Sequence, residues 1–172
     1  YLKIVLDEEW LEDASYPVTV DPVLQQYRAR NRREKACISS DGKVYDTLYV
    51  GKKSDVIYRS FVSFDLPEMP ANSVVTEALL YVDGLGSNYL EADMVDEEWH
   101  EDELKDTADI WENQPSASRK LDYANSGVGS YFNITKGVRE WTMAEEYDPE
   151  GNEEQSENEK YHRNYGIRIS AY

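Results

Sequence analysis

The chain has 172 residues, enough for one domain with a sizeable core, and its 40% apolar and 12% aromatic content is typical of a globular protein rather than a disordered one. Its 18 basic and 35 acidic residues give a net charge of −17, which repels phosphate backbones and disfavours nucleic acid as a partner. The single cysteine, Cys37, excludes an internal disulfide, and no apolar run is long enough to predict insertion into a membrane.

The N-terminal region, residues 1–30, is interpreted as a strand pair and a connector. "YLKIVL" and "YPVTVDP" have the alternation of short strands, and the basic stretch that follows runs into a further strand near Cys37. Residues 31–172 are expected to form the main domain.

Apolar side chains in the main domain recur with a period of two, which predicts strands. In "YRSFVSFDLP", Val62, Phe64 and Leu66 fall on one face, and Pro67 ends the strand. In "SVVTEALLYVDG" both faces are partly apolar, which is typical of a central strand. "TLYVG" at 47–51 and "YGIRISAY" at 165–172 are further strand candidates.

One segment breaks this period. Ile134, Val138 and Trp141 are spaced as on one face of a helix of about two turns, with Thr135 as its expected N-cap. Residues 145–160 then form an acidic stretch that predicts a loop before the last strand. The whole pattern predicts an all-β antiparallel sandwich with one short helix.

Several stretches, in this order, resemble the DNRLRE domain family, which is also treated as carbohydrate-binding module family 96. They are "LYVGKKSD", "YRSFVSFDLPEMPANSVVTEALLYV", "EEWHEDELKDTADIWENQP", "GSYFNITKGVREW" and "NYGIRIS", and "YPVTVDPVL" is similar to the segment that precedes such domains in wall-associated and YD-repeat (Rhs-like) proteins. Asn133 departs from the family pattern, which has Asp at that position.

The resemblance implies a jelly-roll-like β-sandwich in a secreted or cell-wall protein of a Gram-positive bacterium. Such a module would be non-catalytic and would bind carbohydrate, either cell-wall or environmental polysaccharide. The alternative is a structural or adhesin spacer domain that contacts neighbouring domains of the same polypeptide and holds no small ligand.

Trp99, Trp111 and Trp141 each lie within a short motif, and large aromatic side chains in such places are mostly buried. We therefore expect all three indoles in the core. The acidic residues between Trp99 and Trp111 are then expected on a surface loop, with Asn113 shaping the turn that leaves it.

A calcium site is one candidate for the acidic stretch after the helix. Four oxygen-bearing side chains stand at alternate positions around Gly151, which weakly resembles a calcium-binding loop: Asp148, Glu150, Asn152 and Glu154. A solvated acidic loop is the competing interpretation.

The sequence does not predict an enzyme. Both histidines, His100 and His162, lie in polar stretches, and the sequence has neither a G-x-S-x-G nucleophile elbow nor a phosphate-binding glycine loop. Cys37 lies in a strand-like context, where a small buried side chain is expected rather than a nucleophile.

A sugar-binding surface needs exposed aromatic rings beside polar groups. The candidates for this role are Tyr45, Tyr49, Tyr58, Arg59 and Tyr89.

Overall fold

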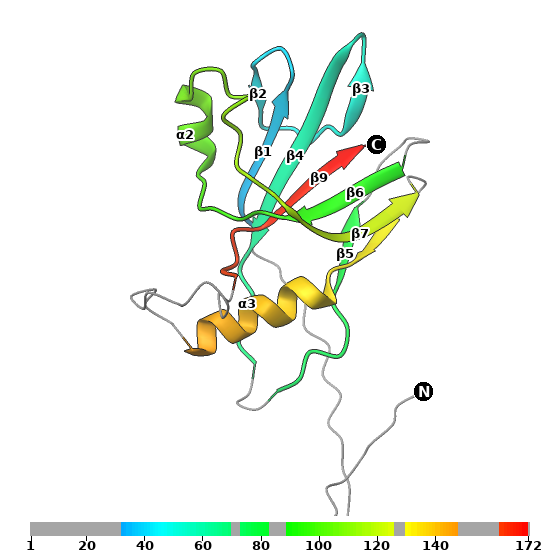
Figure 1. Cartoon of the computed structure of the whole chain (residues 1–172), viewed down its shortest axis with the longest axis vertical. Coiled ribbons are helices and arrows are strands. Elements are labelled where there is room, and N and C mark those ends of the chain that lie inside the picture. Colours follow the sequence, from blue (N-terminus) through cyan, green and yellow to red (C-terminus); the bar gives the residue numbers. More distant parts are fainter. Residues whose placement is uncertain (1–31, 70–72, 83–88, 126–129, 148–161, 172) are drawn as a thin grey trace, which may run out of the picture.

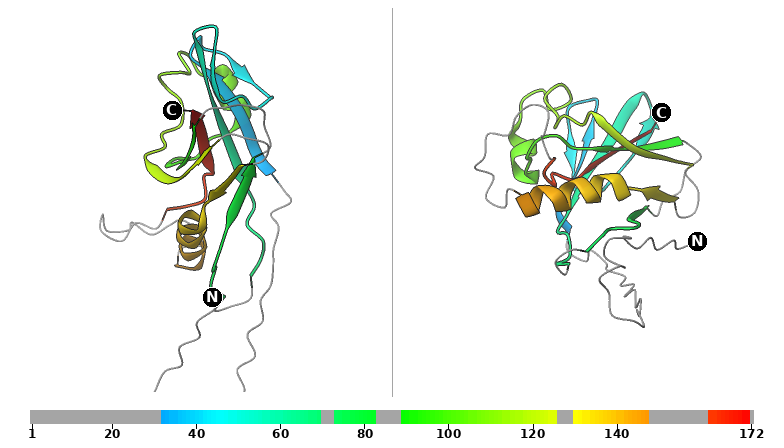
Figure 2. Two further views of the ribbon diagram at one scale, coloured as in Figure 1. Left: turned by 90° about the vertical axis from the view of Figure 1, so that its right-hand side faces the viewer. Right: turned by 60° about the horizontal axis from the view of Figure 1, so that its bottom comes forward.

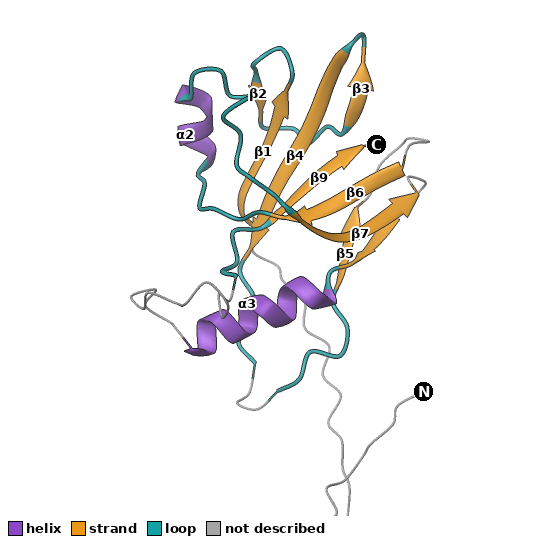
Figure 3. Ribbon diagram, viewed as in Figure 1, coloured by secondary structure: helices purple, strands orange, loops and turns teal. Residues whose placement is uncertain are grey.

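Antiparallel strands make up most of the computed structural model, which describes residues 32–69, 73–82, 89–125, 130–147 and 162–171. The expected N-terminal strand pair lies outside these residues. The strands are β1 (Arg32–Ser39), β2 (Val44–Tyr45), β3 (Gly51–Lys53), β4 (Val56–Phe64), β5 (Leu79–Val82), β6 (Tyr89–Met94), β7 (Arg119–Asn125), β8 (Ser130–Asn133) and β9 (Ile167–Ala171). Figure 3 shows that strands form the body of the molecule.

The main sheet has seven strands in the order β2-β1-β4-β9-β6-β7, with β3 paired to β4 beside this path. A second sheet contains β5 and β8, and every described strand pair is antiparallel. The expected all-β, sandwich-like class is therefore confirmed, and the finer jelly-roll arrangement stays a prediction.

The main sheet carries a core cluster on each of its faces, and alternate side chains of one strand contribute to different clusters. In β4, Val62 belongs to one core cluster and the adjacent Phe61 to another. The first cluster joins the main sheet to β8 and the helix α3 (Thr135–Tyr147), which lies below the strands in Figure 1. The second packs under the segment that contains the helix α2 (Glu101–Asp106).

The described part of the chain contains two helices, whereas the sequence predicted one. The α3 segment was predicted, but it runs for 13 residues, so the helix continues past the expected start of the acidic loop at residue 145. Thr135 is its first residue rather than its cap. The Thr135 backbone N–H donates to the Asn133 side chain at 3.1 Å, so Asn133 performs the capping role expected of Thr135.

Helix α2 lies in a segment that the sequence predicted to be a loop. Its only buried side chain is Leu104. A six-residue helix with one apolar anchor leaves no periodic stripe in the sequence. Glu101, Asp102 and Glu103 occupy its first turn, where carboxylates interact favourably with the helix dipole.

The tryptophan prediction is confirmed for Trp99 and Trp141, which are 5% and 2% exposed. It is wrong for Trp111, which is only partly buried at the border of the second cluster. The Trp99 indole N–H donates to the Tyr165 carbonyl at 2.8 Å, which satisfies its polar group inside the core.

Two strand predictions are also corrected. The segment 47–50 is not a strand, because its Tyr49 carbonyl accepts hydrogen bonds from side chains instead of from a neighbouring strand. The donors are Ser60 Oγ at 2.8 Å and Cys37 Sγ at 3.4 Å. The expected central strand at 73–84 is reduced to β5, which pairs only with β8 among the described strands.

Candidate functional site

Three of the five tyrosine and arginine candidates meet on one face of the main sheet. The Tyr45 ring centre lies 6.0 Å from those of Tyr49 and Tyr58, and the Tyr49 and Tyr58 centres are 5.8 Å apart. The rings meet edge-on or tilted, which is the geometry that aromatic quadrupoles favour. We call Tyr45, Tyr49 and Tyr58 the tyrosine cluster.

Strand pairing positions this cluster. Tyr45 in β2 lies opposite Cys37 of β1, and Tyr58 in β4 lies opposite Ser39 of the same strand. Paired residues in an antiparallel ladder share a face, so the two rings converge across β1. Tyr49 joins them because its carbonyl is held by the Cys37 and Ser60 side chains.

Tyr49 is the most accessible ring of the cluster, with half of its surface exposed. Tyr45 and Tyr58 are partly buried. Burial, followed by the nearby Tyr45 and Asp41, raises the pKa of the Tyr58 hydroxyl, which therefore stays protonated and able to donate a hydrogen bond at neutral pH.

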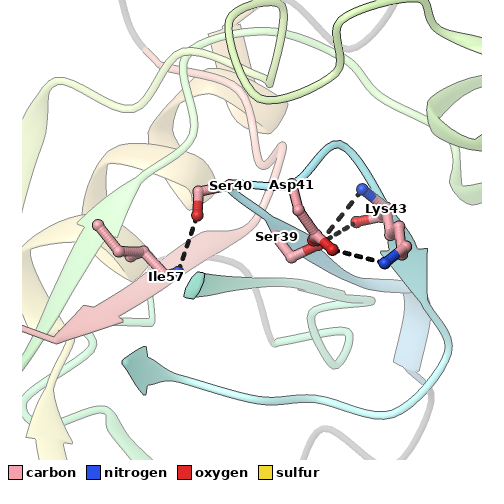
Figure 4. Close-up of polar contacts among 5 residues, drawn as sticks. All are labelled: Ser39, Ser40, Asp41, Lys43 and Ile57. Atoms are coloured by element: carbon pink, nitrogen blue, oxygen red, sulfur yellow. Dashed lines mark hydrogen bonds and ion pairs between the residues drawn. The ribbon is translucent and has the colours of Figure 1, made fainter. Parts of the chain in front are cut away.

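A polar turn joins β1 to β2 (Figure 4), and its Asp41 and Lys43 interact electrostatically with Tyr58 of the cluster. The Ser39 hydroxyl donates to Asp41 Oδ1 at 2.5 Å, and Lys43 Nζ pairs with Asp41 Oδ2 at 2.5 Å. The Ser39 and Lys43 backbones also close the turn, in which Gly42 has a φ of +79°. Behind it, the Ile57 N–H donates to Ser40 Oγ at 2.9 Å.

The charges of this turn influence each other. Hydrogen bonding to Lys43 and Ser39 lowers the pKa of Asp41, and hydrogen bonding to Asp41 raises the pKa of Lys43. Both groups are charged at neutral pH, and both are partly exposed. A donor, an acceptor and phenol rings therefore lie together, a combination that can bind a ring with several hydroxyl groups.

The sequence candidates did not include Asp41 and Lys43. The signal was present in the Asp41–Gly42 pair, because Asp-Gly between two strands predicts a tight hairpin that brings its flanking residues beside the neighbouring strand.

Arg59 and Tyr89, the other two candidates, do not join the cluster. Arg59 follows Tyr58 in β4 and so faces the opposite side of the sheet, where its Nη1 donates to Gln114 Oε1 at 3.0 Å. Tyr89 begins β6 beside the core residue Leu90, so it too points away from the first cluster, with 64% of its surface exposed.

The opposite face carries charged pairs. Arg168 Nη2 lies 2.8 Å from Asp93 Oδ2, and Lys120 pairs with Glu91 and lies 4.3 Å from the centre of the Tyr123 ring. Each of these cations has an acidic partner within the protein, as Lys43 has in Asp41, so the charged pairs do not distinguish the two faces; the tyrosine cluster differs by its three converging rings.

The other sequence candidates have simple outcomes. Cys37 is fully buried, as expected, and burial raises the pKa of its thiol, which is the opposite of what a nucleophile needs. His100 is half exposed between Glu34 and Glu98. The calcium candidates Asp148, Glu150, Asn152 and Glu154 lie outside the described residues, and the part of the chain that is described contains no group of acidic, histidine or cysteine side chains arranged to hold a metal.

No family model, curated protein or solved structure matches this chain. In the described part of the chain, neither helix has the length and apolar character that crossing a membrane requires.

Proposed function

We propose that the chain is a non-catalytic carbohydrate-binding module of a secreted bacterial surface protein, and that the tyrosine cluster is its binding surface. The observation that carries the proposal is the convergence of Tyr45, Tyr49 and Tyr58 beside the Asp41–Lys43 pair. An exposed phenol ring can lie against the apolar face of a sugar, while the polar turn hydrogen-bonds to its hydroxyl groups.

The binding mode follows from the exposure of each group. Tyr49 supplies the accessible ring, and the partly buried Tyr45 and Tyr58 hold it in place. Because the rings are fixed by their mutual packing, little side-chain entropy is lost when a ligand binds. The preference for polysaccharide over nucleic acid agrees with the net charge of −17.

The test is a glycan array of neutral and acidic polysaccharides, followed by titration calorimetry with the best ligand. Tyr49→Ala should weaken binding at least tenfold, because it removes the accessible ring. Tyr123→Ala is the matched control, since Tyr123 is a similarly exposed tyrosine (55%) on the opposite face. Equal losses in both variants, or a loss with Tyr123→Ala alone, would contradict the assignment of the cluster.

A structural or adhesin spacer is the second candidate, and one observation favours it. The outer face of the small sheet exposes Leu79, Tyr81 and Tyr131, with the Tyr81 and Tyr131 ring centres 4.9 Å apart. Such a patch suits contact with a neighbouring domain of the same polypeptide. No binding across the whole glycan array would favour this function over carbohydrate binding.

The proposal includes a calcium site in the acidic stretch at residues 148–154. If they hold Ca²⁺, adding the ion should raise the melting temperature, since a ligand of the native state stabilises it. Magnesium at the same ionic strength is the control.

A further inference from the structure

The three rings of the tyrosine cluster do not form one flat surface. The ring planes of Tyr45 and Tyr49 are perpendicular, at 90°, and the plane of Tyr58 is inclined by 53° to the first and by 63° to the second. One such ring can lie against the face of a sugar, but rings inclined in this way cannot all stack on the same sugar. They suit a compact group that contacts every ring at once.

The spacing of the rings fits a bound cation. Their centres lie 5.8 to 6.0 Å apart. A cation over the middle of this triangle is therefore within about 6 Å of every ring centre, the range over which the negative face of an aromatic ring attracts a positive charge. Proteins recognise quaternary ammonium groups with cages of aromatic rings of this kind.

Lys43, which interacts electrostatically with Tyr45 and Tyr58, does not fill this position. Its Nζ pairs with Asp41 Oδ2 at 2.5 Å (Figure 4), and within the described part of the chain Lys43 makes no cation–π contact with the rings. Tyr49 has half of its surface exposed, so the cluster is open to solvent at this ring. The rings can therefore receive a cation from solution.

The charge of the protein also favours a cationic group. The net charge of −17 attracts cations to the molecule as a whole. At the cluster, burial, followed by Tyr45 and Asp41, raises the pKa of the Tyr58 hydroxyl, and the opposing effect of Lys43 is smaller. The negative charge of the turn therefore outweighs its positive charge at Tyr58.

We propose that the tyrosine cluster binds a quaternary ammonium group carried by the polysaccharide, with this group over the rings and near the Asp41 carboxylate. A quaternary ammonium has no N–H groups, so it loses no hydrogen bond when the rings replace its water. The inference rests on the proposed carbohydrate binding, and it specifies the substituent of the glycan that is recognised.

The test uses choline chloride, titrated into the full chain and followed by the NMR shifts of the tyrosine ring protons. The control ligand is dimethylbutanol, which has the shape of choline but carbon in place of the charged nitrogen. Choline should bind at least tenfold more tightly than dimethylbutanol, because charge is the main difference between them. Equal affinities, or absence of choline binding, would overturn the proposal.

Variants of Tyr49 separate attraction to the ring face from simple apolar contact. Tyr49→Phe keeps the ring and should change the choline affinity less than threefold, whereas Tyr49→Leu keeps only apolar surface and should weaken binding at least tenfold. Both variants should fold, because Cys37 and Ser60 hold Tyr49 through its backbone carbonyl. Equal choline affinities of the two variants would count against a cation site. Asp41→Asn should weaken the binding of choline and leave that of dimethylbutanol unchanged.

The carrier of the group is tested with a polysaccharide that bears phosphocholine, the same polysaccharide after removal of the phosphocholine, and phosphatidylcholine vesicles. The substituted polysaccharide should bind most tightly. Binding to the vesicles alone would overturn the assignment to a glycan. Equal, Tyr49-dependent binding of both polysaccharides would overturn recognition of the ammonium group but leave the proposed carbohydrate binding intact, so the two failures are distinguishable.

Discussion

The guanidinium carbon of Arg59 lies 4.4 Å from the centre of the Trp111 ring, although the two residues come from β4 and from the segment after α2. Gln114 adds a second link: its Oε1 accepts from Arg59 Nη1, and its side-chain amide donates to the Trp111 carbonyl. Burial, and then the neighbouring Arg168, lower the pKa of the Arg59 guanidinium, which nevertheless stays charged at neutral pH. This contact attaches the acidic segment around α2 to the main sheet.

The first prediction measures that attachment. In a double-mutant cycle with Arg59→Met and Trp111→Leu, we expect a coupling free energy of about 1 kcal/mol, the range of a partly desolvated cation–π contact. Urea unfolding of the four proteins provides the free energies. Additive effects of the two substitutions would show that the ring and the cation are merely neighbours.

The second prediction concerns the ion pair between Arg168 and Asp93, whose side chains are 20% and 6% exposed. Asp93→Ala should lower the free energy of unfolding by about 3 kcal/mol, because it leaves a largely buried cation without a partner. The exposed pair between Arg33 and Asp65 is the control, and Asp65→Ala should cost less than about 1 kcal/mol. Similar losses at both sites would refute the importance of burial.

The third prediction compares two glycines with positive φ. At Gly166 (φ +98°) an added Cβ would lie 2.3 Å from the Val62 carbonyl oxygen, whereas at Gly42 (φ +79°) it would meet nothing within 4 Å. Both alanine variants incur backbone strain, of about 1 kcal/mol, but only Gly166→Ala adds a clash with the backbone of β4. Thermal unfolding should show a clearly lower melting temperature for Gly166→Ala, and equal values would contradict this reading.

The fourth prediction concerns pH. Burial raises the pKa of the Cys37 thiol above its ordinary value of 9.0, so the unfolded chain loses this proton first as the pH rises. The stability that the neutral thiol contributes is complete below pH 9 and is lost as the pH rises through the folded-state pKa.

Cys37→Ala should therefore reduce the loss of stability between pH 8 and pH 10, measured by urea unfolding in the two proteins. In the wild-type chain the thiol should react with a disulfide reagent only after urea is added. Fast labelling of the native protein at pH 8 would contradict the burial of Cys37.

The sequence predicted the elements whose apolar pattern is strong. Val62 and Phe64 in β4, Ile167 and Ile169 in β9, and the α3 stripe that includes Trp141 all lie in the first core cluster or pack against it. Their periodicity records burial directly, because each alternate or fourth side chain faces the same neighbour.

Elements whose limits depend on distant partners were missed. Helix α2 is held by Leu104 against a cluster formed by β1 and β4, and its N-terminal Glu101 N–H donates to Glu34 of β1 at 3.1 Å. The segment at 47–50 loses its strand character because Cys37 and Ser60 bind its backbone. These interactions join residues that are 11 to 67 positions apart in the sequence. A local sequence pattern therefore cannot predict them.

The same division applies to the candidate site. The sequence by itself determined that this protein is rich in tyrosine, that its charge is unsuited to nucleic acid, and that its strands must pair to bury their apolar faces. The alternation of strand side chains also places Arg59 on the face opposite to its neighbour Tyr58. Only the tertiary structure decided that Tyr45, Tyr49 and Tyr58 meet. The physical reason is strand register, because a shift of one residue moves every side chain to the other face, and register is set by pairing between distant segments.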